Sequence, residues 1–238
     1  MNNDKKIRIL GLTLARGGSK SVPKKNIKNI AGLPLISYTI SEALKSKYIT
    51  RYIVSTDDKE IQDIAIKHGA EVPFLRPIEL STDHASSSSA LQHAVNWVEK
   101  EEGVNYDYVV ELMCTNPLKT ANDIDLSISK LISTRADSVI AVHQLEDHHP
   151  ARIKKIINDK IVDFCTPEIS ESRRQDLKPI AYIRSGSIYA LNRDYLMTQG
   201  KRYGSVNSRP YILPNERAVN IDTEIDFMIA ELMLKEKL

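Results

Sequence analysis

The chain has 238 residues, of which 42% are hydrophobic and 27% are charged, and its formal net charge at pH 7 is +2. This is ordinary globular composition, and no apolar stretch is long enough to predict a membrane span. The nearly neutral balance provides no overall basic field for nucleic acid or an anionic membrane, so anion binding must depend on local clusters. Two isolated cysteines, Cys114 and Cys165, indicate neither a disulfide framework nor a zinc site and favour a reducing, cytoplasmic location.

The first half of the sequence alternates between strand and helix patterns. Short aliphatic and β-branched runs predict buried strands over Ile7–Leu14, Tyr52–Val54, Val72–Phe74, Tyr108–Met113 and Ser138–Val142. Apolar residues at helical spacing predict helices over Leu35–Leu44, from Asp57 or Asp58 to Gly69, over Ala90–Glu101, and from Asn122 or Asp123 to about Ser133. This order predicts an α/β fold, with a mostly parallel central sheet and helices on both faces, as a single domain over residues 1–238. Such sheets bind ligands at the carboxyl ends of their strands.

The pattern changes after Pro150. Two apolar runs, Ile153–Ile157 and Ile161–Phe164, flank Asn158-Asp159-Lys160 and predict a β-hairpin. Further strands are predicted over Ile180–Ile183, Ser187–Leu191 and Tyr211–Leu213. A final amphipathic helix is predicted over Asp222–Leu234, with its inward face formed by Ile225, Met228, Ile229 and Leu232.

The loop after the first strand is the most informative segment. Residues 16–26 read Arg-Gly-Gly-Ser-Lys-Ser-Val-Pro-Lys-Lys-Asn. Glycines let backbone N–H groups close around phosphate oxygens, an arginine can grip phosphate bidentately, and lysines add point charges. A solvated basic loop would have the same composition, but the position at the end of a strand favours triphosphate binding. The order Gly18-Ser19-Lys20-Ser21 breaks the P-loop template, and G-x-G-x-x-G is also absent.

Residues 15–26 resemble the opening signature of the CMP-sialic acid synthetases, the acylneuraminate cytidylyltransferase family, with Ser21 where glycine is usual. The resemblance runs nearly from end to end, through the blocks Leu33–Ile36, Tyr38–Ile40, Val54–Asp58, Gly69–Phe74, Arg76–Leu80, Ala136–Val139, Arg174–Leu177, Gly186–Ala190 and Ile221–Glu224. It implies a nucleotidyltransferase-like fold and an enzyme that uses CTP and Mg²⁺ to form a CMP-sugar and pyrophosphate from an acidic keto sugar. It also implies a homodimer in which a β-containing insertion, at about residues 145–185, serves dimerisation and the sugar site.

The resemblance also implies roles for individual residues. Arg16, Lys25 and Asp222 are expected to be catalytic, with Arg16 and Lys25 holding the triphosphate. Cytosine is expected to contact Asn26 and Arg76. The full set expected to bind CTP is Ala15, Arg16, Gly17, Gly18, Ser19, Lys25, Asn26, Arg76 and Ser88, with Ala15 against the base and Ser88 near the ribose. The alternatives are that Asn26 caps a turn and that Arg76 is a surface arginine.

A candidate Mg²⁺ site precedes the final helix. The family typically has Asp-Ile-Asp-Thr here, whereas this chain has Asn220-Ile221-Asp222-Thr223. Residues two apart on an extended segment point the same way, so Asn220 and Asp222 can share one ion. Mg²⁺ often uses only one or two carboxylates together with substrate phosphates. The alternative is that Asp222 caps the helix.

The sugar site is expected to recognise a carboxylate. The candidate residues are Met113, Thr115, Arg173, Arg174 and Gln175, with Lys154 or Lys155 assisting, and the alternative is a solvated loop. Met113 stands where the family commonly has glutamine, and loss of that polar contact favours a less hydroxylated acceptor. A legionaminic, pseudaminic or amino-octulosonic acid is expected rather than N-acetylneuraminic acid. Because Met113 and Asn220 both depart from the family pattern, a nucleotide-binding scaffold or weakly active relative is the alternative function.

Overall fold

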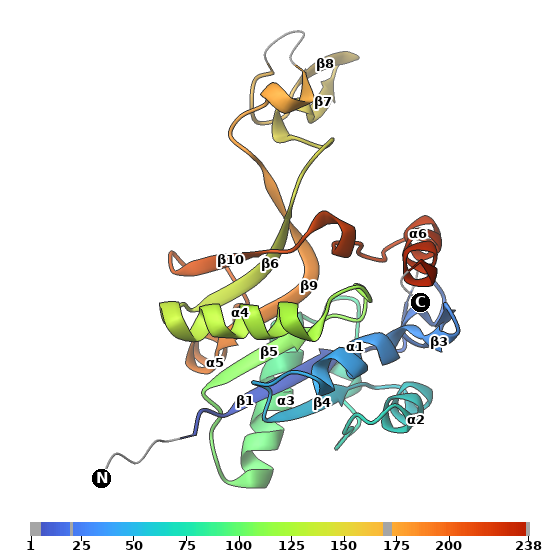
Figure 1. Ribbon diagram of the computed structural model, residues 1–238, viewed down its shortest axis with the longest axis vertical. Coiled ribbons are helices and arrows are strands. Elements are labelled where there is room, and N and C mark those ends of the chain that lie inside the picture. Colours follow the sequence, from blue (N-terminus) through green and yellow to red (C-terminus); the bar gives the residue numbers. More distant parts are fainter. Residues whose placement is uncertain (1–5, 20, 169–172, 237–238) are drawn as a thin grey trace.

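The computed structural model describes residues 6–19, 21–168 and 173–236. Its centre is a six-stranded sheet in the order β10-β6-β9-β5-β1-β4 (Figure 1). These strands are β1 (Ile9–Leu14), β4 (Arg51–Ser55), β5 (Tyr108–Leu112), β6 (Ser138–Gln144), β9 (Tyr182–Asn192) and β10 (Ser208–Ile212). All neighbours pair in parallel except β9, which is antiparallel to both β5 and β6. The predicted mostly parallel sheet is confirmed.

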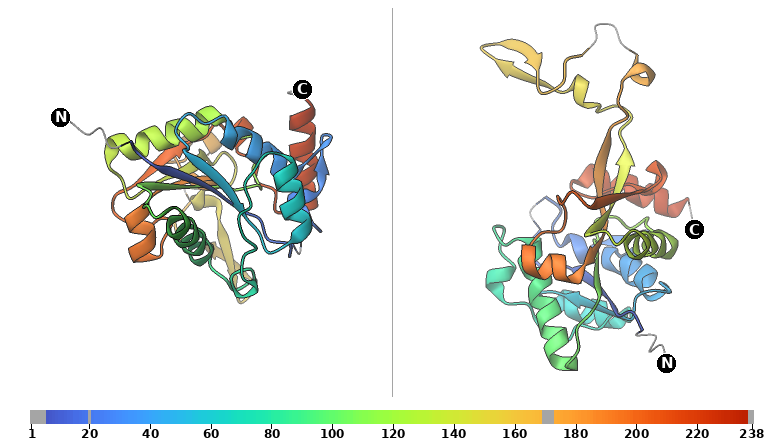
Figure 2. Two further views of the ribbon diagram at one scale, coloured as in Figure 1. Left: turned by 90° about the horizontal axis from the view of Figure 1, so that it is seen from below. Right: turned by 90° about the vertical axis from the view of Figure 1, so that its left-hand side faces the viewer.

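Helices cover both faces of the sheet (Figure 2). They are α1 (Leu35–Leu44), α2 (Lys59–Lys67), α3 (Ser87–Glu102), α4 (Ala121–Thr134), α5 (Arg193–Gln199) and α6 (Glu224–Lys235). α1, α2 and α4 pack in one apolar layer, which includes Val110, and α3 and α5 pack in the other, which includes Val109. Because successive strand residues point to opposite faces, β5 contributes to both layers and is buried on both sides. None of the helices in the described part of the chain has the length and apolar character that a membrane span requires.

Two strand predictions are corrected by the structure. The strand predicted over Val72–Phe74 is wrong: only isolated bridges form beside it, at Glu71 and Leu75. Pro73 lies between these bridges and has no N–H to continue a ladder, which accounts for the break. The strand predicted over Tyr211–Leu213 lies instead at Ser208–Ile212, and its Pro210 is tolerated because β10 is an edge strand.

The two strands predicted around Ser185-Gly186 are one continuous strand, β9. The pairing register with β6 shifts between Ile140 and Val142, so the Ser185-Gly186 region passes a bulge rather than a chain break. Gly186 has a φ of 59°, and a Cβ there would lie 2.9 Å from Asn220 Oδ1. Glycine therefore allows β9 to pass close to the segment before α6.

A β-hairpin arm, β7 (Lys154–Ile157) and β8 (Lys160–Asp163), projects away from the sheet (Figure 1). Its turn residues Asn158 and Asp159 both have positive φ, as a type I′ turn requires. The predicted hairpin is confirmed. Its apolar residues are not covered, since Ile156 is 77% exposed and Ile161 is 75% exposed.

The inward face predicted for the last helix is wrong. α6 buries Phe227, Ala230 and Leu234 in a small cluster with Val22 and Leu118, which lie in two loops at the end of the sheet. The residues expected to face inward are all exposed: Ile225, Met228, Ile229 and Leu232. The helix is apolar on two faces, so periodicity alone could not decide which face meets the core. A two-stranded ribbon, β2 (Asn29–Ile30) and β3 (Leu33–Pro34), contributes Ile30 to the same cluster.

Asp123 connects three segments near the end of the sheet. It is the third residue of α4, and it forms a capping box with Thr120, which is the N-cap in place of the predicted Asn122 or Asp123. Its buried carboxylate also accepts hydrogen bonds from Arg217 Nε at 3.0 Å, Arg217 Nη2 at 2.7 Å and Tyr211 Oη at 2.7 Å. Asn116 Nδ2 in turn donates to the Arg217 carbonyl at 2.8 Å. Asp123 thereby fixes the approach to residues 220–222.

We expect Asp123→Asn to lower the free energy of unfolding at pH 7 by about 3–5 kcal/mol, because the variant leaves Arg217 without its buried partner. Burial alone would raise the pKa of Asp123, but hydrogen bonds from Arg217, Tyr211 and Thr120 hold it below its usual value. The carboxylate therefore stabilises the fold above pH ~4, and this contribution is lost as the pH falls through the folded-state pKa.

Urea denaturation at pH 7 and at pH values below 4 measures both effects. Asp147→Asn is the control, because Asp147 pairs with Arg174 at the surface and should contribute little. Equal stabilities of the two variants at pH 7 would contradict the role given to Asp123.

Candidate active site

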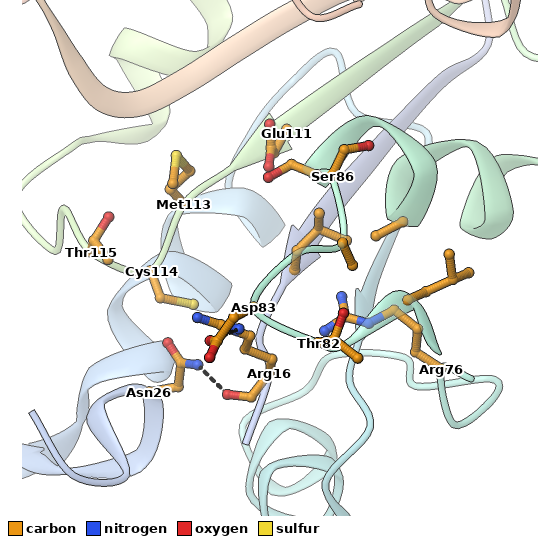
Figure 3. A pocket seen from close by; sticks show the side chains of 15 residues that line it. Arg16, Asn26, Arg76, Thr82, Asp83, Ser86, Glu111, Met113, Cys114 and Thr115 are labelled. Atoms are coloured by element: carbon orange, nitrogen blue, oxygen red, sulfur yellow. Dashed lines mark hydrogen bonds and ion pairs between the residues drawn. The ribbon is translucent and has the colours of Figure 1, made fainter. Parts of the chain in front are cut away.

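A cavity of about 260 Å³ opens at the carboxyl ends of β1 and β5 (Figure 3). Five of the residues selected from the sequence line it: Arg16, Asn26, Arg76, Met113 and Thr115. They come from the loop after β1, the segment after α2 and the segment after β5. The expectation that ligand-binding groups gather at this edge of the sheet is consistent with this arrangement.

Arg16 is held in the cavity by two contacts. Its Nη1 pairs with Asp83 Oδ1 at 2.7 Å, from the loop before α3. Asn26 Nδ2 donates to the Arg16 carbonyl at 3.0 Å (Figure 3). Asn26 is buried, and its side chain therefore positions the loop rather than capping a turn.

Gly17 brings the same loop against the start of α2. Its N–H donates to Asp57 Oδ1 at 3.2 Å, and Asp58 is the N-cap of α2. A Cβ at position 17 would lie 2.6 Å from Asp58 Oδ2, so a larger residue would push the loop away. Gly18 and Ser19 continue the loop without lining the cavity, and Lys20 lies outside the described residues.

Arg76 is not a surface arginine, since it is only 5% exposed. Its guanidinium donates to Ser81 Oγ at 2.9 Å and to the Ser55 carbonyl at 3.4 Å, and it lies 3.6 Å from Asp57 Oδ1. Burial lowers the pKa of Arg76, the charge of Asp57 opposes this shift, and the charge of Arg16 adds a smaller lowering. Two arginines that repel one another across a cavity are stabilised by an anion bound between them.

Lys25 joins the loop to the segment before α6. Its Nζ donates to the Ile221 carbonyl at 2.7 Å and lies 3.7 Å from Asp222 Oδ1. The Ile221 N–H donates to the Thr115 carbonyl at 2.8 Å, which connects this group to the cavity wall. Thr223, not Asp222, is the N-cap of α6, so the alternative role of Asp222 as the cap is wrong.

Asn220 and Asp222, the candidate Mg²⁺ ligands, lie next to one another before α6. Asn220 Nδ2 donates to Asp222 Oδ2 at 2.6 Å, which confirms that the two side chains meet. Asn220 Oδ1 is buried and has no hydrogen-bond partner in the described structure. Within residues 6–19, 21–168 and 173–236, no three His, Cys, Asp or Glu side chains cluster as a metal site. Amide and carboxylate oxygens are the hard donors that Mg²⁺ prefers, and binding of that ion by Asn220 and Asp222 stays a prediction.

Lys119 stabilises the wall of the cavity, although its own side chain does not line the cavity. Its buried Nζ donates to Thr39 Oγ1 at 2.6 Å, to the Met113 carbonyl at 2.7 Å and to the Asn116 carbonyl at 2.7 Å. An ammonium has three N–H donors, so all are used. Lys119 thus fixes the segment between Met113 and Asn116, which includes the wall residue Thr115.

Comparison with known proteins assigns the family. The sequence profile described as cytidylyltransferase matches residues 10–163. The chain belongs to the cytidylyltransferase family. It is 34% identical to the pseudaminic acid cytidylyltransferase of Campylobacter jejuni over 93% of this chain and 94% of that protein. It is 32% identical to the CMP-N,N'-diacetyllegionaminic acid synthase of Legionella pneumophila over 96% and 97%.

The fold is shared with a solved CMP:2-keto-3-deoxy-manno-octonic acid synthetase in complex with CTP. The TM-score is 0.73, with 19% sequence identity over 97% of this chain and 100% of that one. The expected nucleotidyltransferase-like fold is confirmed, and the chain is a nucleotidyltransferase.

Other selected residues of this cytidylyltransferase lie outside the cavity. Ala15 is fully buried at the end of β1, and its N–H donates to the Ser55 carbonyl at 3.0 Å. Ser88 lies in the first turn of α3 but does not line the cavity, whereas Ser86 and Ser87 do.

The structure does not bring the basic sugar candidates to Met113 and Thr115. Arg173 pairs with Asp176, Arg174 with Glu146 and Asp147, and Lys154 with Asp163 and Glu168, all within residues 145–185. Arg174 and Gln175 line a separate cavity with Leu145 and Ile180, and Lys155 is exposed on β7. Within one chain, the carboxylate-binding candidates and the cavity are therefore apart.

Sequence reasoning missed three cavity groups: Asp83, Glu111 and Lys119. Asp83 and Glu111 line the cavity, and Lys119 lies under its wall. The sequence does show a glutamate within an apolar strand and a lysine after Pro117-Leu118. Their roles cannot be predicted from it, because the side chains that they contact are distant in sequence.

We expect the activity of this cytidylyltransferase to depend on the protonation of Lys119. Burial lowers the pKa of Lys119 to about 8, against the opposing influence of Cys114, Glu42 and Asp123. The neutral amine has two N–H donors for three acceptors, so the segment loosens and the KM for the acceptor rises above about pH 8. The pH dependence of fold stability is different from that of activity. The pKa of Lys119 is about 8 in the folded protein and 10.5 when unfolded, so the unfolded state binds more protons between these values. The contribution of Lys119 to the free energy of unfolding therefore rises with pH from about 8 to 10.5.

Lys119→Arg keeps the charge and does not titrate in this range, so its acceptor KM should stay flat where the native value rises. Steady-state kinetics from pH 7 to 9.5 on both proteins measure the difference. Parallel pH profiles would contradict the role of Lys119.

Proposed function

We propose that this cytidylyltransferase transfers CMP from CTP to an acidic keto sugar of the nonulosonic type and releases pyrophosphate. The observation that carries the proposal is that Arg16 and Arg76 line one cavity, whose wall residue Thr115 is hydrogen-bonded to Ile221, the partner of Lys25. This arrangement offers Arg16 and Lys25 for a triphosphate, Asn26 and Arg76 for a base, and a separate wall for an acceptor. The names of the relatives, which act on pseudaminic and legionaminic acids, support the acceptor class.

The reaction needs positioning and charge neutralisation more than covalent chemistry. The anomeric hydroxyl of the sugar attacks the α-phosphorus, and pyrophosphate leaves. Arg16 and Lys25 hold the triphosphate, and Asn26 and Arg76 contact the base. Asp222 and Asn220 would hold Mg²⁺, and the ion would supply positive charge to offset that of the phosphates. The catalytic roles of Arg16, Lys25 and Asp222 stay predictions.

The acceptor is proposed to be less hydroxylated than N-acetylneuraminic acid. Met113 lies at the cavity wall and presents a thioether rather than an amide to the acceptor. An apolar side chain pairs poorly with a hydroxyl but packs well against a methyl or methylene group. Legionaminic, pseudaminic and amino-octulosonic acids are the proposed candidates. A reducing, cytoplasmic setting for these substrates also stays a prediction.

A homodimer is proposed to complete the sugar site. Arg173, Arg174 and Gln175 lie between β8 and β9, apart from the cavity within one chain, so a second copy is the simplest way to bring such groups to it. Two uncovered apolar surfaces support this: the hairpin arm and the outer face of α6. Apolar patches of this kind mark interaction surfaces on globular proteins.

Pyrophosphate release with CTP, Mg²⁺ and a panel of acidic keto sugars tests the reaction. We expect turnover with legionaminate, pseudaminate or an octulosonate in preference to N-acetylneuraminate. If the protein is instead a nucleotide-binding scaffold, CTP should raise its melting temperature and none of these sugars should be turned over. Equal turnover of N-acetylneuraminate and the other acids would contradict the role of Met113.

Lys25→Met is expected to lower kcat/KM for CTP by roughly a hundredfold or more, since it removes a charged donor from the triphosphate site. Lys24→Met is the matched control, because the Lys24 side chain is 68% exposed and pairs with Glu60, whereas that of Lys25 is 14% exposed. Similar kinetics of the two variants would contradict the role of Lys25.

Light scattering is expected to show a dimer that Ile156→Asp/Ile161→Asp converts to a monomer. The monomer should bind CTP but lose turnover of the acceptor. Ile66→Asp is the control, because Ile66 is also exposed but lies on α2. A native monomer across a wide concentration range would rule out the dimer.

A further inference from the structure

Glu111 is an unexpected group in the wall of the cavity. It lies in β5 between Val110 and Leu112, which are both fully buried, and is itself 2% exposed. Alternation along the strand directs Glu111 to the same face as Met113, so both reach the cavity (Figure 3). A buried carboxylate here requires an explanation, because this site is proposed to hold a triphosphate and a sugar acid.

Arg202 compensates the charge from the loop after α5. Its Nη1 pairs with Glu111 Oε2 at 2.7 Å, and its guanidinium lies 4.7 Å from the centre of the Tyr189 ring. Burial raises the pKa of Glu111, and the nearby Arg202 opposes that shift. The ion pair is therefore held by an aromatic neighbour and by strand β9, which pairs Tyr189 with Glu111.

Charge decides what this carboxylate can contact in the cavity. A phosphate or a sugar carboxylate would be repelled by Glu111 unless a cation lay between them. Hydroxyl and amide N–H groups are donors, and hydrogen bonds to an ionised acceptor are the stronger kind. Ser86, at the start of α3, lies on the same side of the cavity in Figure 3 and adds a hydroxyl there.

We propose that Glu111, held by Arg202, forms a subsite that accepts hydrogen bonds from a sugar ring in the cavity. The donors are hydroxyl or amide N–H groups, of either the ribose of CTP or the acceptor sugar. The charge of this subsite is opposite to that of Arg16 and Arg76. It gives the neutral parts of the substrates a fixed orientation. This inference rests on the proposed function, because it takes CTP and a sugar acid to be the molecules that bind in this cavity.

Calorimetric binding of CTP, 2′-deoxy-CTP and 3′-deoxy-CTP to the native protein and Glu111→Gln tests the ribose. Pyrophosphate release with legionaminate, pseudaminate and N-acetylneuraminate, which differ in their hydroxyl and amino groups, tests the acceptor. We expect the native protein to prefer the substrate with the donor by roughly tenfold to a hundredfold, and Glu111→Gln to lose most of that preference. Loss confined to the nucleotides assigns the ribose, and loss confined to the acids assigns the acceptor.

Glu99→Gln is the matched control, because Glu99 also forms a buried pair with an arginine, Arg193, at 2.6 Å but does not line the cavity. Glu111→Asp is a second test if Glu111→Gln folds poorly, since it keeps the charge but moves it by one methylene. The proposal is overturned if both Glu111 variants keep every native preference, as Glu99→Gln should. Nucleotide binding does not depend on turnover, so this result is distinguishable from a failure of the proposed reaction.

Discussion

The hydrogen bond from the Lys25 ammonium to the Ile221 carbonyl joins two segments that lie 196 residues apart, and the rest of the site depends on it. Ile221 also donates to Thr115, so the loop after β1, the segment after β5 and the segment before α6 meet in one place. Each segment alone is an ordinary loop. Their connection brings the basic loop, the cavity wall and the candidate metal ligands Asn220 and Asp222 into one site.

Charge organises this site into two sides. On one side, the buried Arg76 and the partly exposed Arg16 repel one another, and Asp57 and Asp83 lie beside them. A bound phosphate could take the place of Asp83 at Arg16, while Arg76 is proposed to meet the base. On the other side, Glu111 and Arg202 neutralise each other within an apolar wall. An anionic nucleotide and a hydroxylated ring can therefore be oriented by the same cavity.

The sequence predicted the strand and helix order well, because short buried strands and amphipathic helices have clear local patterns. It also located Arg16 and Asn26 in the loop after β1, and Arg76 through its resemblance to a family motif. It did not predict that β9 inserts antiparallel between β5 and β6, since pairing between distant strands leaves no local pattern. The wrong face of α6 has a similar cause: Phe227 and Ile229 are both apolar, and only contacts with Val22 and Leu118 decide between them. Lys119 and Glu111 appeared as isolated polar residues because their partners, Thr39 and Arg202, are remote in sequence.

Hydrogen–deuterium exchange with and without CTP and Mg²⁺ tests most directly whether three distant segments form one nucleotide site. We expect protection from exchange in residues 16–26, 113–119 and 217–222 together, with no change in the hairpin strands 154–163. Protection limited to residues 16–26, with the other two segments unchanged, would contradict it.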